Sequence, residues 1–149
     1  MEQPYPVMLD LNGRSAAVIG GGRVAARKIR GLLAVGAKVT VISPTLNTVI
    51  DSESVVWLKR TYCRDDVKKM ALLFACTNDR VVNQRVVDEA SEFQWVNNTS
   101  DQTQSNFFNV AILREAGLQV TISTNGQSPT LAKQVKQRLA PWLHENFGN

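Results

Sequence analysis

The sequence has few of the residues that usually build metal and redox centres. Its 149 residues include two cysteines, Cys63 and Cys76, and one histidine, His144. The two cysteines have neither a metal-site nor a redox spacing, so we expect them to be reduced thiols. We therefore predict no metal site made of histidine and cysteine, and only carboxylates could still contribute ligands.

Long hydrophobic segments are also lacking. No apolar run approaches the roughly 20 residues that a membrane-spanning helix needs. The first ten residues, MEQPYPVMLD, have no basic start and no long apolar core, so we predict no secretory signal. Hydrophobic residues make up 44% and charged residues 20%, as is typical of a globular protein. We expect a cytoplasmic protein of about one domain.

Positive charge is in modest excess, with a net charge of +4 at pH 7. A basic protein attracts anions, which include nucleic acid, a membrane surface and acidic small molecules. The sequence has no long basic run and no basic patch interleaved with aromatic residues, so nothing indicates nucleic acid. We expect an anionic small molecule as partner, and neither nucleic acid nor a membrane.

The positions of apolar and turn-forming residues predict alternating strands and helices. A short apolar run at 15–20 predicts a buried strand, and Val24 to Val35 has hydrophobic residues at helical spacing. Further strands are predicted at 38–43, 54–60, 71–77, 94–98 and 118–124. This alternation predicts an α/β fold, a doubly wound Rossmann-type sheet that is mostly parallel.

Two later helices are predicted from their capping residues. The first starts after Asn78 or Asp79, and its expected inward face is Val81, Val82, Val86 and Ala90. The second has Ser128 as N-cap and Pro129 at its first position, and its expected apolar stripe is Leu131, Val135, Leu139 and Leu143. Pro141 lies inside this stripe and predicts a kink or break near Ala140.

The run at 20–25, GGGRVA, matches the pattern G-x-G-x-x-[G/A]. Gly20 would permit the tight turn, Gly22 would let the backbone approach a pyrophosphate, and Ala25 would let the helix pack on the strand. The free N–H groups at the helix start favour phosphate. Because the motif follows a strand and opens a helix, it predicts dinucleotide binding, and the alternative is a tight turn without a ligand.

The acidic residue that usually ends the second strand of this fingerprint is missing, because the strand ends in Ser43-Pro44. Ser43 can still hydrogen-bond a ribose hydroxyl, less strongly than a carboxylate would. Arg23 is a candidate contact for a 2′-phosphate, or else a solvated surface residue. The residues leave the choice between NAD and NADP open.

Four segments occur in the order typical of precorrin-2 dehydrogenases: YPVMLDLNGRSAAVIGGGRVAARK, FACTNDRVVNQRV, VNNTSDQTQSNFFNVAI and TISTNGQSPTLAKQVKQRL. Over essentially its whole length the chain resembles this family, which includes the N-terminal dehydrogenase–ferrochelatase part of siroheme synthase. The resemblance implies oxidation of precorrin-2 to sirohydrochlorin with NAD⁺ in siroheme biosynthesis. It also implies an anionic tetrapyrrole substrate and, in some members, insertion of Fe²⁺.

In a doubly wound sheet the ligand binds beyond the carboxyl ends of the strands. We expect the segments that resemble the family to converge there on one cofactor site. Asn97 and its neighbour Asn98 are either amide contacts to the cofactor or polar strand-end residues. The predicted cofactor-binding residues are Gly20, Gly22, Arg23, Val24, Ser43, Thr77, Asn78 and Asn97.

The family usually carries an N-V-V-D segment whose Asp is the suspected general base. Aligning Asn106-Phe107 with the family's corresponding pair places Ser100 where that Asp stands, and Asp101 one residue later. The candidate catalytic residues are therefore Asp101 and Ser100. Either the loop shifts so that Asp101 takes the role, or the base is absent, and a loop carboxylate beside Asn is also a common turn former.

The resemblance makes Lys133 and Lys136 candidate partners for substrate carboxylates, with Arg138 and Arg114 as further candidates; the alternative is a solvated helix face. Ser128 is either an N-cap or the start of a helix whose N–H groups receive a carboxylate. We expect 1–149 to be one NAD(P)-binding domain, in which about 105–149 forms the far wall of the cleft.

Family members usually continue past the Ser-Pro helix into a helical region that builds the dimer. We expect this protein to lack that region, so both homodimer formation and metal chelation stay open. The rival function is a non-catalytic Rossmann module that binds a dinucleotide or a tetrapyrrole.

Overall fold

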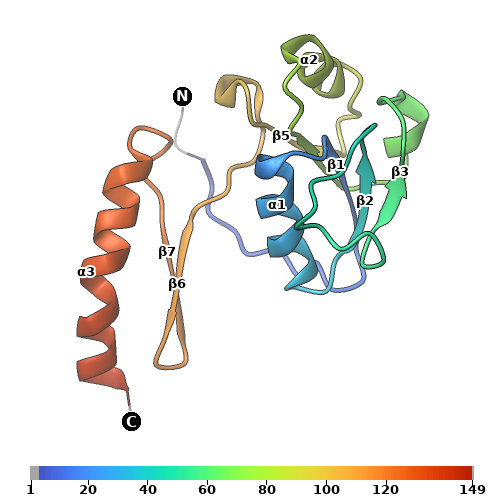
Figure 1. Cartoon of the computed structure of the whole chain (residues 1–149). Helices are drawn as coiled ribbons and strands as arrows, with labels where there is room; N and C mark the ends of the chain where they lie inside the picture. Colours follow the sequence, from blue (N-terminus) through green and yellow to red (C-terminus); the bar gives the residue numbers. More distant parts are fainter. Residues whose placement is uncertain (1–3, 149) are drawn as a thin grey trace. The chain divides into compact units, whose positions relative to one another are not determined.

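The computed structural model describes residues 4–148, which form two compact units (Figure 1). Residues 7–107 make up the parallel-sheet unit. Residues 4–6 and 108–148 make up the hairpin–helix unit. None of the described helices has the length and apolar character needed to cross a membrane.

Five parallel strands form the sheet of the first unit, in the order β3-β2-β1-β4-β5. Helices α1 (Arg23–Leu33) and α2 (Arg80–Asp88) make connections between strands, and η1 (Arg64–Val67) and η2 (Gln102–Gln104) are short 3-10 helices. The strand order reverses beside β1, which is the switch point of a doubly wound sheet. The predicted fold class is confirmed. The strands are β1 (Ser15–Ile19), β2 (Lys38–Ile42), β3 (Val56–Leu58), β4 (Leu72–Ala75) and β5 (Trp95–Asn98).

Hydrophobic cores cover both faces of this sheet. Successive residues of a strand point to opposite faces, so Ala16 and Val18 join one core while Ala17 and Ile19 join the other. All four residues of β4 are buried, as the apolar run predicted for a central strand. The carboxyl ends of β1, β2 and β4 are therefore held rigidly at one edge.

The predicted inward face of the second helix region is confirmed at Val82, Val86 and Ala90, and is wrong at Val81. Val86 is buried and Val82 is partly buried, but Val81 is 70% exposed, so its expected inward position is wrong. Asn83, a polar residue, is fully buried in its place. Asp79 is the N-cap and accepts from the N–H of Val81, which sets the helix start. Residues 83 and 86, three apart, therefore share the inward face.

The loop after β5 covers the open edge of the sheet. Asn106 Oδ1 accepts from Val96 N–H at 2.6 Å, and its Nδ2 donates to Gln94 O at 3.1 Å. Ser105 Oγ accepts from Asn98 N–H at 2.9 Å. These side chains take the hydrogen-bonding place of another strand, which protects the edge. They also anchor the end of the loop that carries Ser100 and Asp101.

The hairpin–helix unit contains an element that the sequence did not reveal. Strand β6 (Ala111–Glu115) pairs antiparallel with β7 (Leu118–Ile122), and only the second was predicted. The two turn residues, Ala116 and Gly117, have φ of 52° and 73°. Two positive φ angles are typical of the tight type I′ hairpin turn, and A-G is a weaker signal for it than N-G.

Helix α3 (Pro129–Phe147) begins as predicted, because the Ser128 hydroxyl accepts from the N–H of Leu131 at 3.1 Å. Of the predicted kink or break near Ala140, the break is wrong, since the helix continues through Pro141 to Phe147. Beyond Pro141, Leu143 is buried and the rings of Trp142 and Phe147 pack edge to face. These contacts offset the hydrogen bond that proline removes.

The predicted stripe of α3 is also partly wrong. Leu131 and Val135 are exposed, whereas Ala132 and Leu143 are buried.

Candidate functional site

A cavity of about 330 Å³ lies at the carboxyl ends of β1, β2 and β4. Its size falls within the range of small-molecule sites. The cavity brings together five of the eight predicted cofactor residues: Gly20, Gly22, Ser43, Thr77 and Asn78. The other lining residues are Ile19, Gly21, Ile42, Pro44, Thr45, Thr61, Tyr62, Cys76, Asp79 and Val82.

The three glycines of the loop have different structural roles. Gly20 has φ of +115°, and a Cβ added there would lie 2.6 Å from Cys76 O. A Cβ on Gly21 would clash with Thr45 O. A Cβ on Gly22 would have no protein atom within 4 Å. Gly20 and Gly21 are therefore required by the protein's own packing, whereas Gly22 leaves open space in the cavity wall.

The start of α1 can receive an anion. Gly22 is its N-cap and provides no side-chain hydrogen bond, and the first turn contains no acidic residue. The first N–H groups of a helix lack partners within the helix and carry partial positive charge. Together with the open space at Gly22, this cradle fits a diphosphate. Arg23 and Val24 are exposed on the same turn and do not line the cavity.

The end of β2 carries no carboxylate, as the sequence indicated. Ser43 is buried, its N–H donates to Leu58 O at 3.2 Å, and its carbonyl accepts from Trp57 Nε1 at 2.9 Å. The backbone of Ser43 is thus fixed from the β3 side while its side chain lines the cavity. The only carboxylate among the lining residues, Asp79, is engaged by the N-terminus of α2.

Two lining residues after β3 and β4 are kept uncharged by burial. Burial raises the pKa of the Cys76 thiol to about 11, against the opposing effect of the Lys28 ammonium. Burial also raises the pKa of Tyr62, and the nearby Glu89 carboxylate adds to the shift. The cavity wall therefore presents a neutral thiol and a neutral phenol at physiological pH.

The candidate catalytic residues lie in the loop after β5. The Ser100 hydroxyl donates to Asn98 Oδ1 at 2.8 Å and accepts from Asn83 Nδ2 at 3.1 Å. The Asp101 carboxylate accepts from the N–H and the hydroxyl of Thr103, at 3.0 and 2.6 Å. These hydrogen bonds lower the pKa of Asp101, so it is an ionised and weak base. The turn-forming role of this carboxylate is therefore present.

Asn97, predicted as a cofactor contact, is buried and does not line the cavity. Its Nδ2 donates to Phe107 O at 3.1 Å, which ties β5 to the end of the parallel-sheet unit. Sequence reasoning missed Asn83, which contacts both Thr77 and Ser100. In the sequence, Asn83 is distinguished by being a single Asn between the valines of a predicted helix.

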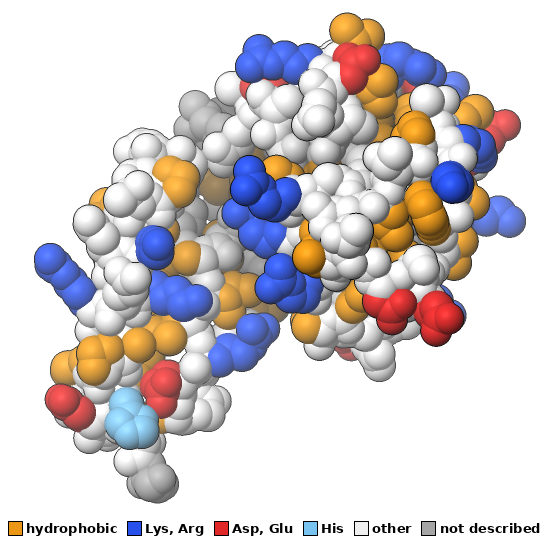
Figure 2. All heavy atoms as spheres, in the orientation of Figure 1, with side chains coloured by type: hydrophobic (Ala, Val, Ile, Leu, Met, Phe, Trp, Pro, Cys, Tyr) orange, Lys and Arg blue, Asp and Glu red, His pale blue; other side chains and the backbone are white. Residues whose placement is uncertain are grey.

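The predicted substrate residues lie on α3 of the hairpin–helix unit. Ser128 caps the helix, Lys133 is exposed, and Lys136 is partly buried. Lys and Arg side chains are visible on the surfaces of both units in Figure 2.

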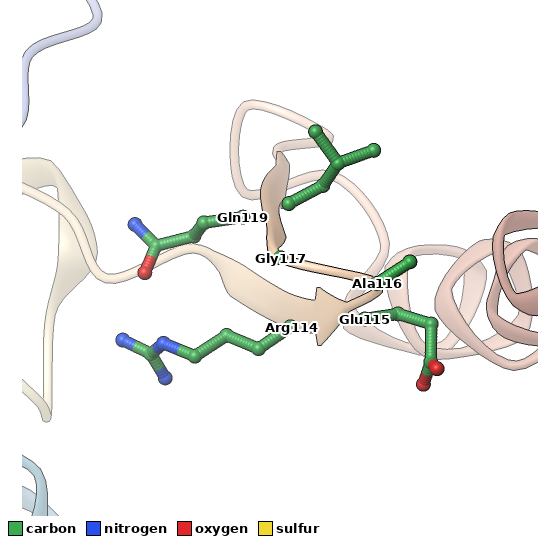
Figure 3. Close-up of a pocket in the computed structure, with 6 residues that line it drawn as sticks. Arg114, Glu115, Ala116, Gly117 and Gln119 are labelled. Carbon is green, nitrogen blue, oxygen red and sulfur yellow. The ribbon is translucent and has the colours of Figure 1, made fainter. Parts of the chain in front are cut away.

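This unit has its own shallow hollow at the hairpin turn, lined by residues 114–119 (Figure 3). The side chains of Arg114 and Gln119 extend to one side of it, and Glu115 extends to the other. The Glu115 carboxylate lies 2.9 Å from His144 Nδ1 and is thereby tied to α3.

Comparisons with known proteins agree with this geometry. The family described as "Putative NAD(P)-binding" matches residues 7–111, and "Sirohaem biosynthesis protein central" matches residues 117–140. A precorrin-2 dehydrogenase of Priestia megaterium is 35% identical, with 96% of this chain and 73% of that protein aligned. The solved structure of "SirC, precorrin-2 dehydrogenase" has a TM-score of 0.85 at 34% identity, covering 97% of this chain and 73% of that one.

Longer relatives match as well. A siroheme synthase of Mannheimia succiniciproducens is 30% identical over 97% of this chain, which spans only 31% of that protein. The two family models together span the glycine loop, the β5 loop and the first part of α3. The chain belongs to the family of precorrin-2 dehydrogenases and siroheme synthases.

Proposed function

We propose that this protein oxidises precorrin-2 to sirohydrochlorin with NAD⁺, as a step of siroheme biosynthesis. The observation that carries the proposal is the open cradle at Gly22, where the uncapped start of α1 faces a cavity at the switch point of the sheet. Both cysteines are free thiols, which fits the cytoplasmic location expected for the protein.

NAD⁺ supplies a hydride acceptor when it is bound. The backbone N–H groups at the start of α1 would hold its diphosphate, and Ser43 would hydrogen-bond the adenosine ribose. Thr77 and Asn78, at the end of β4, would contact the nicotinamide half. The chain contributes placement of the two reactants, which accounts for a large share of many rate enhancements.

The oxidation removes one hydride and one proton from the substrate, so a proton acceptor is required. We assign this role to Asp101, whose ionised carboxylate is exposed at the start of η2. Ser100 has its hydroxyl engaged by Asn98 and Asn83, so it positions the loop instead of reacting. Because its pKa is lowered, Asp101 is ionised at neutral pH and is therefore in the proton-accepting form, as a weak base.

The substrate carries carboxylates, and we propose that α3 binds them. The Ser128 hydroxyl satisfies the N–H of Leu131, the Ser128 N–H donates to Thr124 Oγ1, and Pro129 has no N–H. The N–H of Thr130 is then the first-turn donor that would meet a carboxylate. Lys133 and Lys136 follow on the same helix and add positive charge.

Purified protein with NAD⁺ and precorrin-2 is expected to produce NADH, which is followed by absorbance. The variant Asp101→Asn, which keeps the size and part of the hydrogen bonding to Thr103, is expected to lower kcat about 100-fold with little change in NAD⁺ affinity. Equal turnover by the variant contradicts the assignment of the base. Folded wild-type protein that binds NAD⁺ and produces no NADH instead supports a non-catalytic binding module.

The hairpin–helix unit also has several exposed large hydrophobic side chains, among them Leu131 and Trp142. We propose that this face pairs with a second copy of the chain, giving a homodimer. Sedimentation velocity is expected to show a dimer for the wild type and a monomer for the double variant Leu131→Lys/Trp142→Lys. A wild-type monomer at tens of micromolar contradicts this part of the proposal.

A further inference from the structure

The side chain of Asn83 connects the two loops that carry the proposed cofactor and proton-transfer residues. Its Oδ1 accepts from the N–H and the hydroxyl of Thr77, at 3.0 and 2.7 Å. Its Nδ2 donates to Thr77 O at 3.0 Å and to Ser100 Oγ at 3.1 Å. A primary amide has two donor hydrogens and two acceptor lone pairs, so these four bonds use its full capacity.

On one side, Asn83 holds the loop after β4. Thr77 lines the cavity and is bonded to Asn83 through its N–H, its carbonyl and its hydroxyl. The Thr77 hydroxyl also accepts from the N–H of Asp79 at 3.2 Å. The position of this loop, including Asn78 between them, therefore depends on the Asn83 amide.

On the other side, Asn83 holds the loop after β5. The Ser100 hydroxyl, which accepts from Asn83, donates to Asn98 Oδ1. The same Asn98 oxygen also accepts from the N–H groups of Ser100 and Asp101, at 3.0 and 3.2 Å. The backbone position of Asp101 is thus set by the same network that fixes Thr77.

Packing alone does not require a polar residue here. Asn83 is fully buried, and among the largest fully buried side chains of the described residues it is the only polar one. The others are isoleucine, leucine and valine, and a residue of that kind would fill the space. An apolar residue would take these partners from the partly buried N–H and carbonyl of Thr77, which is costly.

We propose that Asn83 is a positioning residue for the oxidation. Its side chain fixes the cofactor loop after β4 relative to the Asp101 loop after β5. It acts through Thr77 and Ser100 and touches neither substrate nor cofactor. The proposal rests on the proposed function, because it concerns the same cavity and the same reaction.

The variant Asn83→Asp tests this directly. The retained oxygen can still accept from Thr77, but an ionised carboxylate would face Thr77 O and could not donate to Ser100. At pH 8 we expect kcat and the affinity for NAD⁺ each to fall about tenfold to a hundredfold, as for a broken buried hydrogen bond. Burial raises the pKa of such a carboxyl, and its protonation restores one donor. At pH 6 the losses in kcat and in NAD⁺ affinity relative to wild type should therefore be several-fold smaller.

Single-loop variants give a second, independent measurement. Ser100→Ala cuts only the connection to the β5 loop, so it should lower kcat and leave the KM for NAD⁺ near the wild-type value. Thr77→Val removes the hydroxyl contacts to Asn83 and to the Asp79 backbone on the β4 side, and should mainly raise that KM. The double variant should deviate from the product of the two effects by about threefold or more, because both residues share Asn83. Val81→Ala, an exposed position on the same helix, serves as the matched control and should behave as wild type.

Equal turnover and affinity in folded Asn83→Asp and Ser100→Ala overturns the proposal, as does an Asn83→Asp deficit that is the same at pH 6 and pH 8. If Asn83→Asp does not fold, independent effects of Thr77→Val and Ser100→Ala overturn it. An inactive wild type removes the proposed function and this proposal together, whereas an active wild type with these negative results removes this proposal alone.

Discussion

Gly22→Asp is expected to weaken NAD⁺ binding strongly while leaving the fold as stable as that of the wild type, or slightly more stable. A Cβ at Gly22 meets no protein atom within 4 Å, and φ of −84° suits any residue, so the side chain fits. The new carboxylate would occupy the start of α1, where the diphosphate is proposed to lie. Repulsion between the two anions should weaken binding by about 2–4 kcal/mol, roughly 30-fold to 1000-fold.

The same carboxylate should stabilise the protein. Asp is a favourable N-cap, interacts well with the helix dipole, and lacks the extra unfolded-state freedom of glycine. A gain of about 0.5–1.5 kcal/mol in the free energy of unfolding is expected from these effects together. Binding is measured by titration calorimetry and stability by urea unfolding.

Gly22→Asn is the matched control, because it has the same size and caps a helix equally well without the charge. It should bind NAD⁺ more weakly than wild type and clearly better than Gly22→Asp. If Gly22→Asp binds NAD⁺ within about threefold of wild type, a difference well under 1 kcal/mol, the diphosphate does not lie at this helix start.

Gly20→Ala is expected to destabilise the parallel-sheet unit strongly, by about 2–5 kcal/mol. Its φ of +115° is unfavourable for a residue with a side chain. The added Cβ would also lie 2.6 Å from the oxygen and 2.8 Å from the carbon of the Cys76 carbonyl. These are backbone atoms of the turn after a fully buried strand, so they cannot swing aside. The change should appear as a lower urea midpoint with or without NAD⁺.

Gly31→Ala provides the comparison within the next element. Gly31 lies inside α1, and a Cβ there would have no neighbour within 4 Å. Replacing a glycine inside a helix by alanine should stabilise the protein by about 0.5–1 kcal/mol. If Gly20→Ala is as stable as Gly31→Ala, the loop does not require glycine at position 20, and this prediction is wrong.

The Rossmann-type sheet and the family were predictable because their signals are local. The apolar runs of β1 and β4 are continuous, as expected for strands buried on both faces, and the glycine motif sits between a strand and a helix. Ser128 and Pro129 marked the start of α3 correctly, because capping depends on residues a few positions apart.

Sequence patterns gave the wrong result for features that depend on contacts between different segments. Val81 was expected inside and is exposed, because the N-cap and the buried Asn83 determine which face of α2 points inward. Pro141 did not end α3, since contacts of Leu143 and Trp142 compensate for its missing N–H. Strand β6 was overlooked because its turn, Ala116-Gly117, has no strong turn signal.

The sequence by itself determined that a strand, a glycine turn and a helix follow one another in this chain, and that its relatives are precorrin-2 dehydrogenases. Such information is contained in short stretches, where backbone preferences and spacing are sufficient. Only the tertiary structure decided that Gly20 faces Cys76 while Gly22 faces open space, and that Asn83 lies between Thr77 and Ser100. The roles of these residues depend on the atoms that distant segments bring opposite them, and chain order does not specify those atoms.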